Sequence, residues 1–96
     1  MRFTWDEKKN LVNVKKHKIS FVQAAHVFSD PLRKELYDEK HSRHDEDRVI
    51  AIGMAVTRLI FVSFTEPDTE TVHIISARKA NERDKEVLLW EWLIIP

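Results

Sequence analysis

The chain has 96 residues, of which 43% are apolar and 33% charged, and its 16 basic and 16 acidic residues give a formal net charge of zero. This length and composition predict one globular domain spanning residues 1–96. The absence of cysteine excludes disulfides, thiol catalysis and cysteine-ligated zinc. A chain without net charge needs a local basic patch for any contact with nucleic acid.

No targeting or membrane segment is expected. The first residues lack the apolar run of a signal peptide, and no stretch reaches the roughly 20 apolar residues of a membrane span. The longest apolar segment, residues 87–95, is interrupted by Glu91. We therefore expect a cytoplasmic protein that does not contact a membrane, in keeping with the lack of cysteine.

The N-terminal third predicts a short strand and two helices. Phe3 and Trp5 alternate with polar residues, as in an edge strand, and Asp6 is typical of a helix N-cap. The helix is expected to run to residue 16 or 17, with Leu11 and Val14 sharing its buried face. A second helix is expected to begin after Ser20 in a capping box and to end at the turn of residues 30–31.

The middle of the chain predicts an antiparallel meander. Residues 34–38 form a weak candidate strand, and residues 40–47 a charged loop. In residues 48–56 the apolar side chains alternate, so that Ile50, Ile52, Met54 and Val56 share one face. Residues 59–64 read as a central strand that ends at residues 66–68, and residues 72–77 as the last strand.

Asn81 predicts the cap of a final helix from Glu82 to about Leu93. The expected order is therefore β-α-α-β-β-β-β-α. It describes an α+β fold with an antiparallel sheet of four to five strands, two N-terminal helices and one C-terminal helix.

Four segments in this order resemble the BrnT family. They are residues 3–17 (FTWDEKKN and NVKKH), residues 19–31 (ISFVQAA and FSDP), the acidic–arginine–glycine segment that runs from Asp38 through His41 and Arg48 to Gly53, and residues 75–80 (ISARKA). The chain departs from the family at Lys18, where glycine is usual and would suit a left-handed helix cap, and at Leu88, where an aromatic residue is common. Residues 90–96 do not correspond to a family feature.

The resemblance implies a RelE-like fold and a metal-independent endoribonuclease toxin of a type II toxin–antitoxin system. It also implies an RNA substrate and no cofactor. The partner it implies is a BrnA-like antitoxin, which neutralises the toxin and through which alone the toxin would be bound to DNA.

Metal-independent RNA cleavage needs a base for the 2′-hydroxyl, cations for the phosphate and an acid for the leaving oxygen. Arg78, where a strand ends, is the first candidate for gripping the phosphate, and a surface ion pair is its structural alternative. Arg48 is a second phosphate ligand, and Glu46, two residues earlier, is a candidate base unless the two only form an ion pair. His17 is a candidate acid or base, because histidine ionises near neutral pH, and its alternative is to stabilise the helix dipole.

Lys16, Arg58 and Lys79 are the candidate RNA-binding residues. His41 and His44 have spacing that could ligate a metal on one helical turn, but no fourth ligand is evident and solvated loop histidines are more common, so no metal site is predicted.

The apolar C-terminal residues fill the core, or else form a surface for a homodimer or an antitoxin. The rival function is therefore a non-enzymatic interaction module or a co-repressor subunit of a DNA-binding complex.

Overall fold

The computed structural model describes residues 1–86, which form an α+β fold as the sequence predicts. One five-stranded sheet carries two helices and a short 3-10 helix, and a last helix begins at Glu82. In chain order the elements are β1 (Arg2–Thr4), α1 (Glu7–His17), α2 (Phe21–Ala25), η1 (His26–Ser29), β2 (Lys34–Tyr37), β3 (Arg48–Ala55), β4 (Arg58–Asp68) and β5 (Thr71–Lys79).

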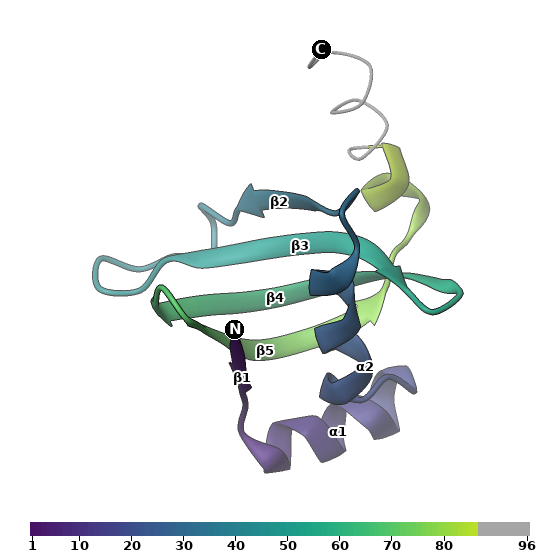
Figure 1. Cartoon of the computed structure of the whole chain (residues 1–96), viewed down its shortest axis with the longest axis horizontal. Helices are drawn as coiled ribbons and strands as arrows, with labels where there is room; N and C mark the ends of the chain where they lie inside the picture. The colour runs from purple at the N-terminus through teal and green to yellow at the C-terminus, as the bar shows by residue number, and fades with distance from the viewer. Residues whose placement is uncertain (87–96) are drawn as a thin grey trace.

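The strands lie in the order β1-β5-β4-β3-β2 (Figure 1). The predicted antiparallel meander is confirmed, because β2, β3 and β4 each pair antiparallel with the next strand in the chain. β1 differs from the prediction, since it pairs with β5 in parallel. Two parallel strands need a long connection that returns the chain to the same end of the sheet, and the many residues between β1 and β5 provide it.

One face of the sheet is covered by α2 and η1 and carries the hydrophobic core (Figure 1). Phe21, Ala24 and Val27 from these helices are fully buried against Val62 and Ile74 of the sheet. None of α1, α2 and η1 covers the other face. The side chains of Ile50, Ile52 and Met54 point to this second face. Residues directly opposite each other on paired strands share a face, and the partners of Ile50 and Ile52 are Ser63 and Phe61.

α1 lies along β5 and not flat on the sheet, which makes one prediction wrong. Leu11 is 62% exposed and Val14 38% exposed, and the buried residue of the helix is Asn13. The Asn13 amide nitrogen donates to the carbonyls of Ile19 and Ala77, and its oxygen accepts from the Ala77 amide at 3.1 Å. The side chain thus satisfies backbone groups that a neighbouring strand would otherwise bind.

The predicted N-caps of α1 and α2 are confirmed. Asp6 accepts from the amides of Lys8 and Lys9, and Ser20 and Gln23 form the reciprocal capping box. Lys18 has φ 60° and ends α1 in the left-handed conformation that glycine adopts most easily.

Among the strand boundaries that differ from the prediction, two have a clear structural cause. β4 continues through Pro67 to Asp68. It does so because pairing with β3 has already ended at Thr65, and pairing with β5 is irregular from Thr65 to Asp68, so the missing proline N–H interrupts no ladder. Val56 does not belong to β3 but to the turn after it, with φ 60° and 86% exposure.

The last helix begins as predicted. The Asn81 side chain accepts from the Asp84 amide at 2.9 Å, and the Asp84 carboxylate accepts from the Asn81 amide at 2.8 Å. The predicted extent of this helix to Leu93, Leu88 and the apolar tail lie outside the described residues. Within residues 1–86, no helix is long and apolar enough to cross a bilayer.

Candidate functional site

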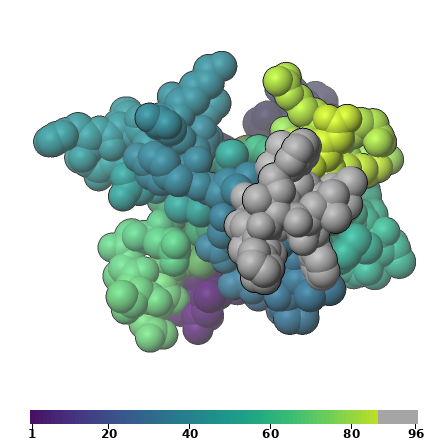
Figure 2. All heavy atoms as spheres, turned by 90° about the horizontal axis from the view of Figure 1, so that it is seen from above, coloured from purple at the N-terminus to yellow at the C-terminus, as the bar shows by residue number. Residues whose placement is uncertain are grey.

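The second face of the sheet carries a hollow of about 320 Å³. Its floor comes from β3, β4 and β5, and one wall comes from the loop after β2. In Figure 2 residues 38–47 project on the left and residues 80–86 on the right, with a hollow between them. We call this the open-face cleft, and its described lining residues are Asp38, His41, Arg48, Ile50, Phe61, Ser63, Ser76 and Arg78.

Arg78 is held in place from two sides. Its guanidinium carbon lies 3.9 Å from the centre of the Phe61 ring, and its two terminal nitrogens donate to the Asp84 carboxylate at 2.6 and 3.3 Å. Asp84 also caps the last helix, so the ion pair ties the end of β5 to that helix. The side chain keeps 34% exposure and can therefore still reach a ligand in the cleft.

Arg48 approaches the same cleft from β3. Its Nε donates to Glu46 at 3.2 Å, and its backbone amide donates to the Ser42 hydroxyl at 2.9 Å. The side chain is 29% exposed. The structure therefore brings Arg48 and Arg78 together on one surface, as the sequence reasoning required.

Glu46 lies outside this cleft. It lines a different hollow, beside Tyr37 and Glu66, and its carboxylate lies between Arg48 and Arg43. The hydrogen bond from Arg48, with a second from Arg43, holds the pKa of Glu46 below its ordinary value. A carboxylate with a lowered pKa is a weaker base, so the geometry favours a role in orienting Arg48.

The sequence reasoning missed the Asp38–His41 pair. His41 Nδ1 lies 2.9 Å from Asp38 Oδ2, and the His41 amide donates to Asp38 Oδ1 at 3.2 Å. The Asp38 side chain is 13% exposed, whereas that of His41 is 59% exposed. An ionised carboxylate only accepts hydrogen bonds, so this contact assigns the proton to Nδ1 and leaves Nε2 free to face a ligand.

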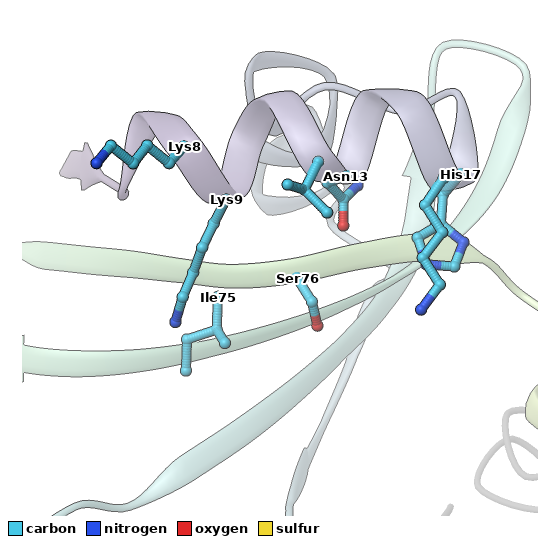
Figure 3. Close-up of a pocket in the computed structure, with 8 residues that line it drawn as sticks. Lys8, Lys9, Asn13, His17, Ile75 and Ser76 are labelled. Carbon is cyan, nitrogen blue, oxygen red and sulfur yellow. The ribbon is translucent and has the colours of Figure 1, made fainter.

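The remaining predicted residues lie elsewhere. Lys16 and His17 line a neighbouring hollow between α1 and β5, which shares Ser76 with the open-face cleft (Figure 3). Arg58 lies at the β3–β4 turn, where it donates to the Lys18 carbonyl at 3.5 Å. Lys79 is exposed and faces away from the cleft, since it follows Arg78 on the strand and pairs with Ile60.

The histidines of the charged loop do not form a metal site with their neighbours. Within residues 1–86, no three His, Cys, Asp or Glu side chains are grouped closely enough to hold a metal ion. The cations at the cleft are instead the two guanidinium groups.

Comparisons with known proteins give one family. The model of a family described as the ribonuclease toxin, BrnT, of type II toxin–antitoxin systems matches residues 5–84. Among solved structures, the chain is similar to the crystal structure of the Brucella abortus ribonuclease toxin, BrnT, with a TM-score of 0.64. The two are 28% identical, and the match covers 85% of this chain and 99% of that one. No curated protein sequence matches the chain.

Proposed function

The chain belongs to the BrnT family of ribonuclease toxins of type II toxin–antitoxin systems, and on that premise we propose that it cleaves RNA in the open-face cleft, as an endoribonuclease that needs no metal ion. The observation that carries this proposal is that one hollow is lined by two arginines and by a histidine paired with an aspartate. These groups are the cations and the proton carrier that phosphodiester cleavage requires.

The reaction begins at the 2′-hydroxyl of the RNA. Nε2 of neutral His41 removes the hydroxyl proton, and the 2′-oxygen attacks phosphorus and forms the P–O bond of a cyclic phosphate. Asp38 stabilises the imidazolium that forms and fixes the ring orientation. The bond from phosphorus to the 5′-oxygen then breaks, and that oxygen takes a proton as it leaves.

Arg48 and Arg78 stabilise the negative charge that builds on the phosphate oxygens. A guanidinium offers several N–H donors in a plane, so it can bind a phosphate while one edge stays bound to a carboxylate. Glu46 and Asp84 are assigned as positioning residues, because each forms an ion pair with one of these arginines.

The other basic residues take supporting roles in this proposal. His17 is the candidate donor of the proton to the 5′-oxygen, because its hollow shares Ser76 with the cleft. Lys16 is assigned to RNA binding in the same hollow. Arg58 and Lys79 contact more distant parts of the RNA, because they lie away from the cleft.

The test is RNA cleavage by the purified chain, with His41→Asn as the variant. Asparagine can still donate to Asp38 but has no nitrogen in place of Nε2, so kcat should fall about 100-fold or more. His44→Asn is the matched control, since it changes an exposed histidine of the same loop that is not among the described lining residues. Full activity of a folded His41→Asn variant would refute the role of His41, and loss of wild-type activity with chelator would refute metal independence.

The partner follows from the family. We propose that a BrnA-like antitoxin neutralises the toxin in the cytoplasm by blocking access to the cleft, and that DNA is bound only through that antitoxin. Intact RNA after prolonged incubation with pure wild-type chain would favour the rival reading, a non-enzymatic interaction module. Whether the apolar tail forms a homodimer interface concerns residues outside the described part of the chain.

A further inference from the structure

We propose that the groove between α1 and β5 binds phosphates of the RNA strand next to the bond that is cleaved. This inference rests on the proposed function and extends its substrate site along α1, from His17 and Lys16 to Lys8 and Lys9. The groove holds about 330 Å³, and its described lining residues are Lys8, Lys9, Val12, Asn13, Lys16, His17, Ile75 and Ser76. We call it the lysine groove.

The groove combines cationic ends with an apolar wall. Lys9 and His17 reach from α1 across β5, with Ser76 between them in Figure 3. Lys9 and Lys16 are seven residues apart, so their positions on the helix are about two turns, or about 10.5 Å, apart. Val12 and Ile75 supply the apolar surface between them. Flexible point charges on both sides of an apolar wall suit a polyanion whose sugars and bases lie between its phosphates.

The charge of the chain is unevenly distributed, and this supports an anionic ligand. Residues 8–29 hold five lysines and no acidic residue, although the whole chain is formally neutral. Among the described residues that line the groove, none is acidic. The neutral net charge therefore hides a local basic patch of the kind that RNA binding requires.

The groove is continuous with the cleft. Ser76 lines both hollows, so a strand whose scissile phosphate lies between Arg48 and Arg78 can pass over β5 into the groove. The opposite direction is unfavourable. Where β3 begins, the neighbouring hollow is lined by four acidic residues, which repel phosphate: Asp45, Glu46, Asp47 and Glu66.

The experiment compares two double variants with the same change in charge. Lys8→Gln with Lys9→Gln removes two groove lysines. Lys15→Gln with Lys18→Gln removes two exposed lysines of the same helix region that are not among the described lining residues. The probe for binding is an 8-mer oligouridylate with 2′-O-methyl groups, which cannot be cleaved. The substrates for cleavage are uridylyl-uridine, whose one phosphate is the scissile one, and unmodified 8-mer oligouridylate.

Each lost phosphate contact lowers the salt slope by about 0.7, so two lost contacts weaken binding by about 1.4 decades for each decade of salt below 1 M. The groove variant should therefore bind the 8-mer about 25-fold more weakly at 0.1 M salt. Its KM should rise for the 8-mer and stay unchanged for the dinucleotide. The control variant should change much less. Equal losses in both variants would overturn the proposal in favour of general charge attraction, and an unchanged affinity of the groove variant would overturn it outright.

Failure of the proposed function gives a different result. If the wild type cleaves neither substrate but the groove variant still loses affinity for the 2′-O-methyl probe, the catalytic assignment fails and the RNA groove stands. If RNA affinity is unchanged and the groove variant instead loses binding to its antitoxin, the surface serves the protein partner and the RNA proposal is wrong.

Discussion

Replacing Asn13 should destabilise this protein more than replacing any apolar residue of the same helix. Asn13 is 6% exposed, and its amide makes three hydrogen bonds to backbone groups of Ile19 and Ala77. The helix propensity of asparagine is below that of alanine, so Asn13→Ala would stabilise an isolated helix. The tertiary contacts predict the opposite sign.

The magnitude follows from the three hydrogen bonds. Each is worth about 1 kcal/mol net, and a buried group left without a partner costs about 1–3 kcal/mol. Asn13→Ala should therefore lower the free energy of unfolding by about 3–5 kcal/mol. Asn13→Asp keeps the shape but points a carboxylate at two carbonyl oxygens. Its stability should therefore rise as pH falls, because the protonated carboxyl can again donate.

Equilibrium unfolding in urea, followed by circular dichroism, measures both variants. Leu11→Ala is the control on the same helix, and because Leu11 is 62% exposed it should cost less than about 1 kcal/mol. A loss below about 1 kcal/mol for Asn13→Ala, or a larger loss for Leu11→Ala, would refute the assignment of Asn13 as the residue that binds the edge of β5.

Four further results are expected. Gly53→Ala should lower the free energy of unfolding by about 1–3 kcal/mol in urea, because the new Cβ would lie 2.9 Å from the Arg33 Cβ atom. Lys18→Gly should raise the thermal midpoint, because the left-handed conformation costs a residue with a side chain about 1 kcal/mol and glycine avoids that cost. Folding lowers the pKa of Glu46, so its carboxylate stabilises the fold fully above its ordinary pKa of 4.5, and this effect is lost as pH falls through the folded pKa. Glu46→Gln should therefore have a lower free energy of unfolding than the wild type at neutral pH, and that free energy should depend less on pH in acid. Asp84→Asn should lower kcat for RNA up to about 100-fold by loosening Arg78, and wild-type kcat in this variant would contradict a positioning role.

Local features of the fold could be predicted from the sequence because their causes are local. A capping side chain acts on amides two or three residues away, so Asp6 and Ser20 marked both helix starts correctly. The orientation of α1 could not be predicted in this way. The rule that apolar residues mark the buried face assumes a helix that lies on a core, whereas α1 lies along a strand edge that needs polar partners, and so Asn13 is buried in place of Leu11.

The candidate site divides in the same manner. Arg48 and Arg78 were identified as candidates by residue type and motif, but their convergence depends on the register of three strands, and a slip of one residue would turn either side chain to the other face. The Asp38–His41 pair was missed because a loop has no periodicity from which to infer a face. The available signal was an acidic residue three positions before a histidine, which is the spacing at which the two side chains meet here.

The register also bears on how two arginines on separate strands would share one phosphate in the proposed mechanism. Arg48 pairs with Thr65 and Arg78 pairs with Phe61, so both lie one strand away from β4 and two residues along it from Ser63, in opposite directions. Strand spacings then place each arginine Cα about 8 Å from that of Ser63, and the two about 16 Å from each other. At that separation the two side chains do not need to compete for one position, yet both can reach an anion seated over Ser63. In the proposed mechanism the sheet thus fixes where the phosphate binds, while the exposed His41 comes from a loop and is the group that RNA binding would have to bring into line.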